Sequence, residues 1–468
     1  MARALCIIAF ALVSPASCAV AAEPIDIGTH KQLFVDDFIV AKSSGVTREL
    51  GRVTKANAGK PIFTDGWFYG TVLRDDNLFK LWYRKPDEGF GYAESTDGLG
   101  FKKKAAVTGI NFAGDFTLAV EIDTHEKNAQ HRYKAAYDAP GMAAGIAHSA
   151  DGITWKPYND GKPVTGRAAD TYNQILWDPL AKTYRLFTRT DFGARGGAGE
   201  VRGTRSMTNP DVRRNSKNWK MVREWIFDKK GRDETKRRQI YATTCWIYQS
   251  VYFALLSVYE YPGDVSEGKT TDTKTRHERD VMNFYIATSR DGDRWDLRWV
   301  YAGKPLVPRG PSGAFDKDIV LQSSTIVTHA DKHWIYYAGA NERHGSAAVR
   351  FDRQHAIGLA TLRLDGFVCL TAAKRPGTVV TKPFKLAGDK LLINVNASAG
   401  KLVVEVLDEC GQPIAKYCGK NAASRTQLDA IGWQPRWKDK ANLSALKNRI
   451  VRLKFTLQNA KLYSFRVQ

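Results

Sequence analysis

Two aspartates stand at matching positions ahead of two short strand-like stretches. Asp115 precedes Asp123 by eight residues, and Asp170 precedes Asp178 by the same interval. The later aspartate of each pair belongs to a turn, so the earlier one lies at the start of the strand that leads to it. Acid/base cleavage of a glycosidic bond requires such carboxylates, one to protonate the leaving oxygen and one as base or nucleophile. Asp115 and Asp170 are therefore candidate catalytic residues; capping a turn is the alternative role for each.

Three further carboxylates extend this set: Glu200, Asp318 and Asp37. Glu200 ends a glycine-rich stretch, residues 190–200, at the expected start of a strand, and is a candidate general acid. Asp318 lies near the expected start of another strand. Asp37 follows Asp36 inside an apolar strand, where an equally good role for the pair is structural, through backbone or arginine bonds.

Candidate substrate contacts are aromatic, amide and charged side chains near these strand starts or in neighbouring loops. They are Trp67, Tyr69, Asn173, Arg189, Glu342 and His344. Flat aromatic faces are surfaces on which sugar rings can stack, and loops on a rigid scaffold commonly carry function. A hydrogen bond to a loop carbonyl is the alternative role for His344.

A repeated turn indicates how these residues are positioned. Residues 91–101, 145–155 and 285–295 each contain a short alternating strand, a Ser-x-Asp-Gly turn and a following aromatic residue. The aspartate can bond its own backbone, and the glycine supplies the positive φ that the turn needs. The first two copies are 54 residues apart, about the length of one four-stranded propeller blade. The pattern predicts a propeller.

Five aromatic-rich strands are expected, one ahead of each turn. They cover residues 79–83, 133–137, 184–187, 252–256 and 334–337. Degenerate turns complete the third and fifth units, so we predict a five-bladed β-propeller over residues 23–372, with the hairpin at residues 32–53 as a candidate for closing the ring. We expect Trp82, Tyr83, Tyr336 and Tyr337 to form the core between blades.

Propeller geometry brings the candidate residues together. The first strand of a blade runs from one face to a turn at the other, and the second strand returns. Polar groups at the starts of first strands, and in loops that join second to third strands, therefore converge on one face.

The sequence pattern changes after Cys369. Residues 373–468 alternate strands and turns without a Ser-x-Asp-Gly motif, which predicts a separate β-sandwich. The predicted fold class is all-β, a five-bladed β-propeller followed by a β-sandwich domain. Cys410 and Cys418 flank a turn and form either a disulfide or two buried thiols.

Residues 1–22 resemble a secretory signal peptide, which predicts a secreted or periplasmic protein. No stretch approaches twenty apolar residues, so we expect no membrane span.

The formal net charge of +21 favours polyanionic partners. The basic run at residues 202–238 is best explained as a solvated loop, and we expect no nucleic-acid partner. The oligomeric state stays open.

Familiar cofactor and hydrolase motifs are absent from the sequence. It contains no HExxH pair, no P-loop, no GxGxxG after a strand and no Gly-x-Ser-x-Gly elbow. These absences argue against nucleotide chemistry and the usual serine hydrolases. We predict no cofactor and no metal requirement.

Several short motifs together resemble a known superfamily. They are Leu33–Phe38, Lys80–Tyr83, Arg132–Lys134, the three Ser-x-Asp-Gly turns, Tyr336-Tyr337 and Lys461–Phe465. Through these motifs the chain resembles exported bacterial relatives of the five-bladed β-propeller glycoside hydrolases. That superfamily includes the invertase-like family 32 and the arabinanase- and xylosidase-like family 43. The resemblance covers essentially the whole chain after residue 22, including the β-sandwich.

The resemblance implies a glycoside hydrolase acting on a poly- or oligosaccharide. The superfamily places a base or nucleophile Asp in blade one, a supporting Asp in blade two and an acid Glu in a later blade. Asp115 fits the second role, but Trp67 and Phe68 occupy the matching strand start of blade one, which leaves Asp65 or the pair Asp36 and Asp37 as substitutes. The invertase-type signatures are absent. The positive charge adds the expectation of a sulfated or uronic sugar, and a catalytically silent glycan-binding propeller is the alternative function.

Overall fold

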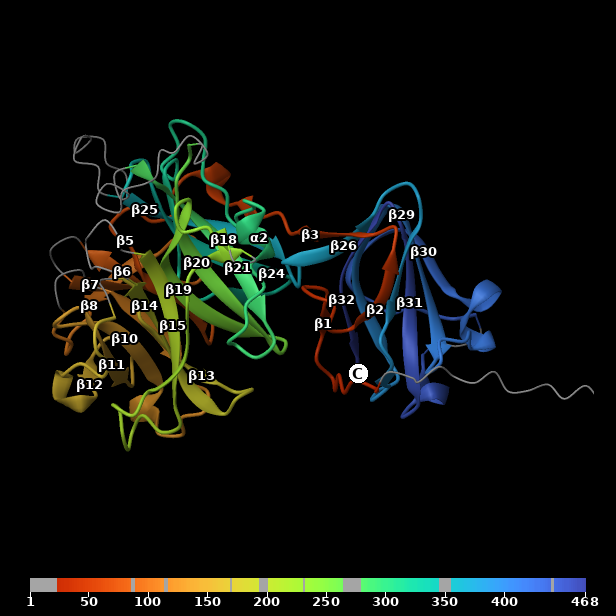
Figure 1. The fold of residues 1–468 in the computed structure, drawn as a ribbon, viewed down its shortest axis with the longest axis horizontal. Coiled ribbons are helices and arrows are strands. Elements are labelled where there is room, and N and C mark those ends of the chain that lie inside the picture. The colour runs from red at the N-terminus through yellow and green to blue at the C-terminus, as the bar shows by residue number, and fades with distance from the viewer. Residues whose placement is uncertain are drawn as a thin grey trace, which may run out of the picture. The chain divides into compact units, whose positions relative to one another are not determined.

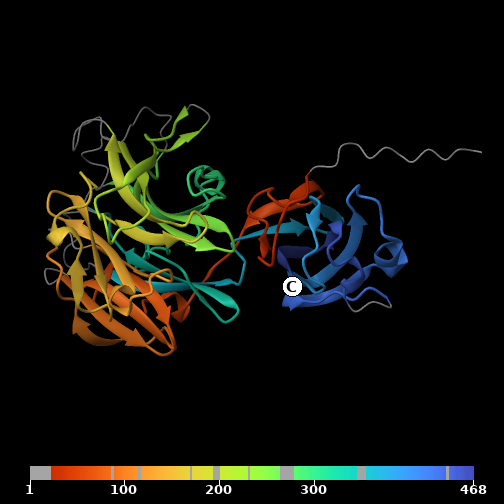
Figure 2. The same ribbon diagram turned by 90° about the horizontal axis from the view of Figure 1, so that it is seen from below.

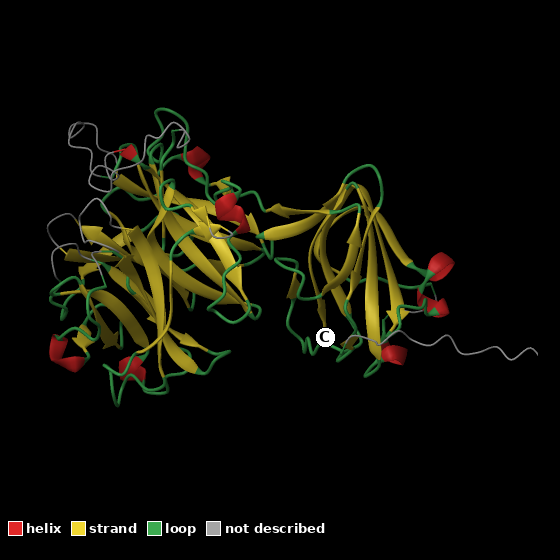
Figure 3. Cartoon of the chain, in the orientation of Figure 1, coloured by secondary structure: helices red, strands yellow, loops and turns green. Residues whose placement is uncertain are grey.

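The computed structural model describes residues 23–468 apart from 86–88, 113–116, 169–170, 193–200, 230–231, 264–278, 345–354 and 439–441. The chain divides into two compact units. One spans Glu49–Val368; the other combines Cys369–Gln468 with the N-terminal segment that ends at Arg48. Strands make up most of both units, and the described helices are single turns (Figures 1 and 3). No described helix has the length and apolar character to cross a membrane.

Three separate four-stranded antiparallel sheets form the first part of the larger unit. They are β5 (Trp67–Asp75), β6 (Leu78–Lys85), β7 (Gly89–Ser95) and β8 (Lys102–Ala106); β9 (Leu118–Ile122), β10 (Tyr133–Ala139), β11 (Ala143–Ser149) and β12 (Trp155–Pro157); and β13 (Gln174–Asp178), β14 (Thr183–Phe192), β15 (Val201–Asn209) and β16 (Lys220–Trp225). Each sheet takes its strands in chain order, as propeller blades do.

One longer sheet contains the strands that the sequence assigns to blades four and five. It runs through β19 (Arg238–Tyr248), β20 (Val251–Glu260), β21 (Val281–Ser289), β22 (Ile319–Gln322), β24 (Lys332–Ala340), β25 (His355–Arg363) and β4 (Thr54–Lys55), with β23 (Val327–His329) paired to β24. A single parallel pair, Met282 with Ile319, joins the two halves. The unit is a β-propeller, whose sheets succeed one another around a centre in Figure 2; we keep the blade numbers one to five.

The three Ser-x-Asp-Gly turns have the predicted conformation. Gly98, Gly152 and Gly292 have φ of 72°, 78° and 78°. In the first turn the Asp97 carboxylate accepts hydrogen bonds from the backbone N–H groups of Leu99 (2.8 Å) and Gly100 (2.9 Å).

These turns also join neighbouring blades. Trp82 of blade one donates its indole N–H to the Gly152 carbonyl oxygen of blade two at 2.6 Å. The Tyr336 hydroxyl of blade five donates to the Gly98 carbonyl oxygen of blade one at 2.8 Å, which ties the last blade to the first. Trp82 and Tyr336 are at most 1% exposed, and the predicted core residues Tyr83 and Tyr337 are equally buried.

Antiparallel pairing gives each blade two distinct ends. In blade three Gln174 at the start of the first strand pairs with Phe187, and Asp191 near the end of the second pairs with Arg202 near the start of the third. We call this side, with the starts of first strands, the loop end. The opposite side, where a hairpin joins the first strand to the second, is the turn end.

A set of three residues recurs at the turn end. A buried aspartate contacts a basic side chain of its own blade and a tyrosine hydroxyl of the next blade. The sets are Asp75 with Lys80 and Tyr133, Asp123 with Lys134 and Tyr184, and Asp178 with Arg185 and Tyr252. In the third set the Asp178 carboxylate lies 2.6 Å from Arg185 Nε and 2.8 Å from the Tyr252 hydroxyl. These Asp-base-Tyr sets bind blades one, two and three each to the next blade.

The smaller unit is a β-sandwich built on one ten-stranded sheet. Its order is β2 (Val40–Ser44), β27 (Gly377–Thr381), β31 (Ile450–Gln458), β29 (Leu391–Asp408), β32 (Ala460–Val467), β26 (Val368–Ala372) and β3 (Thr47–Leu50), with β1 (Gln32–Leu33), β28 (Phe384–Lys385) and β30 (Ala423–Trp433) attached. Phe34, Phe384, Phe455 and Phe465 pack together in its core. Cys418 is a buried free thiol, so the pairing with Cys410 is not formed.

The N-terminal hairpin differs from its prediction. We expected residues 32–53 to close the propeller, but β1 pairs with β32 and β2 pairs with β27, both strands of the sandwich. The segment that closes the last blade follows it: β4 pairs with β25. The alternating apolar pattern of the hairpin fits either sheet, because pattern identifies the buried face of a strand and not its pairing partner.

Candidate active site at the loop end of the propeller

A chain of hydrogen bonds joins three blades at the loop end. The Tyr69 hydroxyl of β5 contacts the Tyr241 hydroxyl of β19. Tyr241 lies 3.2 Å from His344 Nε2, and the Tyr259 hydroxyl of β20 lies 2.6 Å from His344 Nδ1. A neutral imidazole accepts at one nitrogen and donates at the other, so this Tyr-His chain can relay a proton between its ends. The three tyrosines are buried.

Three arginines lie over the rings of these tyrosines. The guanidinium of Arg84 is 6.0 Å from the ring centre of Tyr69, and that of Arg189 is 5.8 Å from Tyr241. Arg202 is 5.1 Å from the ring centre of Tyr259. Cations over aromatic faces are attracted by the ring quadrupole, which holds the guanidinium groups in place. The loop end thus combines aromatic hydroxyls with a concentration of positive charge.

Several buried polar groups at the loop end have no hydrogen-bond partner among the described residues. Asn173, which leads into β13, is fully buried, and neither its amide nitrogen nor its amide oxygen has such a partner. The buried hydroxyls of Thr117 and Thr171, at the starts of β9 and β13, are likewise unpaired. Such groups are rare in folded proteins because each one carries a desolvation penalty. Ligand or water contacts at the loop end would satisfy them.

Two acidic side chains of blade five occupy the same end. Asp318, just before β22, is 3.0 Å from Arg343 Nε and 3.0 Å from Lys317 Nζ. Glu342, after β24, is buried, and its Oε1 lies 3.5 Å from His355 Nε2. Arg343 and the neighbouring His344 therefore link the acids to the Tyr-His chain through one short segment.

Polar side chains close the centre of the propeller below this site. Gln174 Nε2 donates to the carbonyl oxygens of Cys245 (3.0 Å) and Ser324 (2.9 Å). Thr71 Oγ1 lies 2.6 Å from Ser324 Oγ and accepts a hydrogen bond from the Val120 N–H at 2.9 Å. These bonds connect the first strands of blades one to four with the segment after β22. They give the site a rigid floor.

One acid near the axis has an unusual pKa. Glu121 lies on β9, the first strand of blade two, two residues before Asp123. Burial, with a smaller contribution from the charge of Asp123, raises the pKa of Glu121 to about 8. The carboxyl group is therefore mostly protonated at neutral pH.

The predicted site residues fall into three groups. Asp115, Asp170 and Glu200 lie outside the described residues, as does the side chain of Trp67, whose backbone starts β5. Tyr69, Arg189 and His344 meet at the loop end, where Asn173, Asp318 and Glu342 also lie. Asp37 belongs to the other unit, where its exposed carboxylate pairs with Arg48 at 2.5 Å; that contact matches the structural role considered for it.

Sequence reasoning missed Tyr241, Tyr259, Arg84 and Arg202. Tyr241 is the fourth residue of β19, close to the position that Tyr69 holds as the third residue of β5. Comparing the first strands of blades one and four could have identified it. Among the described residues no group of three or more His, Cys, Asp or Glu side chains is arranged to hold a metal ion.

No protein-family model matches the chain, and no curated protein matches it. Similar solved structures include a glycosyl hydrolase from Bacteroides ovatus (13% identity, TM-score 0.43, 67% of this chain and 94% of that one). Others are a family 43 arabinoxylan arabinofuranohydrolase from Bacillus subtilis (10%, 0.37, 87% and 99%) and an N-acetylgalactosamine deacetylase from F. plautii (12%, 0.40, 69% and 97%). At these identities the roles of the site residues have to be argued from this chain itself.

Proposed function

We propose that this chain is a secreted or periplasmic hydrolase that cleaves glycosidic bonds of a poly- or oligosaccharide at the loop end of its propeller. The observation that carries the proposal is the convergence there of tyrosines, arginines, a histidine and unpaired buried amide and hydroxyl groups from different blades. A binding site commonly combines aromatic surfaces with a few fixed polar groups. Sugars present both apolar faces and hydroxyls, so they match this composition.

Catalysis would use paired carboxylates. Asp115 lies two residues before Thr117 and Asp170 lies directly before Thr171; the buried hydroxyls of both threonines have no hydrogen-bond partner in the described part of the chain. Asp318, fixed by Arg343, supplies a described carboxylate at the same end. One of these acids, or Glu200, would protonate the leaving oxygen while a second acts as base or nucleophile. The Tyr-His chain is suited to moving a proton between the site and its surroundings.

The substrate that we propose carries carboxylate or sulfate groups. Arg84, Arg189 and Arg202 lie over three tyrosines of the site, and the chain has a formal net charge of +21. Guanidinium groups are the preferred protein partners of planar anions. Added salt screens such attraction, so the KM for an anionic glycan should rise with ionic strength. A KM unchanged between low and high salt would remove the anionic part of the proposal.

The test is a screen of the purified protein against neutral, uronic and sulfated glycans, with released reducing ends as the readout. We expect at least one glycan to be cleaved, and Asp170→Asn to abolish the release while leaving the melting temperature within a few degrees. Asp331→Asn, on an exposed turn-end residue, is the matched control and should cleave as the wild type does. Retained binding without any product would instead identify a glycan-binding propeller.

A further inference from the structure

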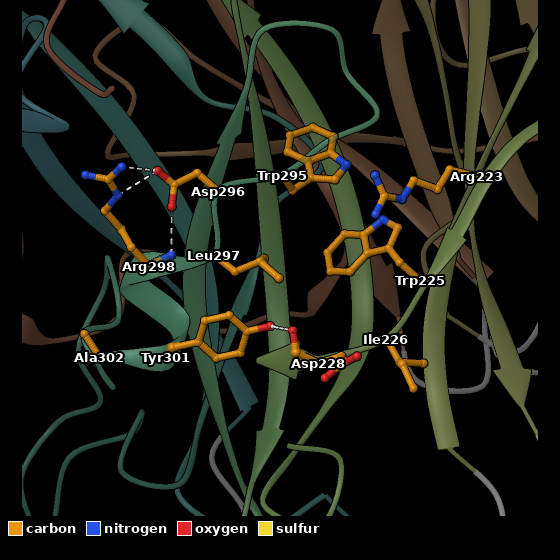
Figure 4. Close-up of a pocket in the computed structure, with 10 residues that line it drawn as sticks. All are labelled: Arg223, Trp225, Ile226, Asp228, Trp295, Asp296, Leu297, Arg298, Tyr301 and Ala302. Carbon is orange, nitrogen blue, oxygen red and sulfur yellow. Dashed lines mark hydrogen bonds and ion pairs between the residues drawn. The ribbon is translucent and has the colours of Figure 1, made fainter. Parts of the chain in front are cut away.

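A pocket lies on the outer parts of blades three and four, away from the residues of the loop-end site. It has a volume of about 800 Å³, within the range of roughly 300–1,000 Å³ typical of small-ligand sites. Figure 4 shows β16 on one side of it and the segment that leads into α2 (Arg298–Tyr301) on the other. Two tryptophans and a tyrosine line it together with charged side chains. No step of the proposed reaction uses these residues.

Trp295 is the aromatic residue of the third Ser-x-Asp-Gly repeat, but it does not have the role of its counterpart. In the second repeat, Trp155 is 2% exposed and donates its indole N–H to the Gly152 carbonyl oxygen at 3.0 Å. Trp295 is partly exposed, and among the described residues its indole N–H has no hydrogen-bond partner. In blade two, therefore, the aromatic residue of the repeat is part of the core. In blade four Trp295 packs with part of its surface against core residues and also lines the pocket.

A second indole faces the same space. Trp225 is the last residue of β16, the outermost strand of blade three, and is also partly exposed. Figure 4 shows its ring and that of Trp295 directed into the pocket, with the Arg223 side chain beside Trp225. Each indole packs partly against the core and leaves part of its surface in the pocket. Together they provide two flat apolar surfaces.

The rim of the pocket is polar and balanced in charge. Arg298 Nε lies 2.6 Å from Asp296 Oδ2, and Arg223 donates to the Asp293 carbonyl oxygen at 3.0 Å. The lining contains two arginines, Arg223 and Arg298, and two aspartates, Asp228 and Asp296. Equal numbers of opposite charges create little net attraction for an ion. They do supply fixed hydrogen-bond donors and acceptors around the aromatic surfaces.

We propose that this pocket is a second carbohydrate-binding site, which holds uncharged sugar rings of a glycan chain. A pyranose ring has an apolar face that stacks on an indole and a rim of hydroxyls that bond to arginine and aspartate. This mixture fits a sugar better than an aliphatic chain, which would leave the polar rim unpaired, or an anion, to which the balanced charges offer no net attraction. The inference rests on the proposed function of the chain as a glycan-acting protein.

The test measures binding and not cleavage. Native gels that contain linear arabinan, xylan or galactan compare the mobility of the wild type with that of Trp225→Ala. We expect at least one of these uncharged glycans to slow the wild type, and Trp225→Ala to weaken this binding at least about tenfold, as truncating a central aromatic contact commonly does. Arg223→Ala, which leaves both indoles in place, should weaken it less.

Trp219→Ala is the matched control. Trp219 is also partly buried in blade three, but its indole N–H donates to the Ser216 carbonyl oxygen at 2.7 Å and it does not line the pocket. It should bind as the wild type does. The inference fails if no uncharged glycan slows the protein, if Trp225→Ala is slowed as strongly as the wild type, or if only polygalacturonate slows it.

The two proposals can fail separately. Asp170→Asn is expected to show the wild-type mobility shift, because the pocket does not include that residue. A protein that binds arabinan through Trp225 but releases no product from any glycan would overturn the proposed hydrolase and keep the second site. Cleavage of glycans without any binding that depends on Trp225 would overturn the second site and keep the proposed hydrolase.

Discussion

The two ends of the propeller use the same kinds of residue in different ways. At the turn end one Asp-base-Tyr set occurs three times, with equivalent partners in successive blades. At the loop end the described residues do not repeat the Asp-base-Tyr set: Tyr69, Arg189, Tyr241 and His344 come from four blades and form one connected cluster, although Tyr69 and Tyr241 occupy similar places on their strands.

The difference indicates how a repeat protein separates stability from function. A contact that recurs in three successive blades meets a structural requirement that these blades share, which is attachment to the next blade. A cluster that several blades build together at one place does not meet that shared requirement. The buried polar groups left unpaired at the loop end, Asn173 among them, point the same way, because a purely structural interior would satisfy them.

The largest effect that we expect on stability is at the turn end. Asp178→Ala removes the acceptor of the Tyr252 hydroxyl and one of the two carboxylate partners of the buried Arg185 guanidinium, which keeps Asp293. Breaking this buried ion pair should lower the free energy of unfolding by about 3 kcal/mol, because Asp293 still compensates part of the charge. Denaturant unfolding measures this change. The exposed Asp331→Ala, also at the turn end, should change it by less than about 0.5 kcal/mol. Equal effects of the two substitutions would mean that the repeated set is not what joins the blades.

A smaller and pH-dependent effect is expected from Asp75→Asn. Burial alone would raise the pKa of Asp75, but hydrogen bonds from Arg132, Lys80 and Tyr133 hold it well below its usual range. A depressed pKa contributes stability that is present above the unfolded value, near 4, and is lost as pH falls below it. Asp75→Asn should therefore destabilise the protein by about 1.5–3 kcal/mol at pH 7, with a difference that shrinks below about pH 4. A difference independent of pH would contradict the ion pairing.

Glu121 should make stability depend on pH in the opposite direction to Asp75. Its pKa is raised to about 8, so the folded state resists ionisation that the unfolded state undergoes near pH 4.5. Stability is then present below that value and lost as pH rises towards 8. Glu121→Gln should remove much of the fall in Tm between pH 5 and pH 8. Parallel Tm curves for the variant and the wild type would show that Glu121 ionises freely in the folded protein.

Much of the fold could be predicted because its signals are local. The Ser-x-Asp-Gly turns and the aromatic second strands lie within short windows, so the sequence alone predicts a propeller and a following sandwich. Pairing partners far apart in the chain leave no such signal, and for this reason residues 32–53 were assigned to the wrong sheet. The strand that closes the last blade, β4, has only two residues, Thr54 and Lys55, too few to show a pattern.

The candidate site was predictable only in part, for a related reason. Tyr69, Arg189 and His344 were found because strand starts and loops of a propeller converge. Tyr241 and Tyr259 were missed because both lie inside strands that are buried on both faces. The sequence pattern of such a strand predicts that its aromatic residues pack in the core. Their contacts with His344 and with the arginines over their rings, which the sequence does not show, distinguish them from the packing tyrosines.

One matched pair of substitutions tests the division between the two ends most directly. Tyr241 and Tyr252 lie on adjacent strands of blade four, and both are buried and hydrogen-bonded, one at the loop end and one at the turn end. The measurement is the rate of reducing-end release by Tyr241→Phe and Tyr252→Phe on the glycan that the wild type cleaves best, with Tm recorded for both. We predict that Tyr241→Phe loses about tenfold or more in rate, the equivalent of one hydrogen bond in the transition state, and that Tyr252→Phe loses stability at an unchanged rate. Equal rates for the two variants, or a slower Tyr252→Phe, would contradict the assignment of function to the loop end.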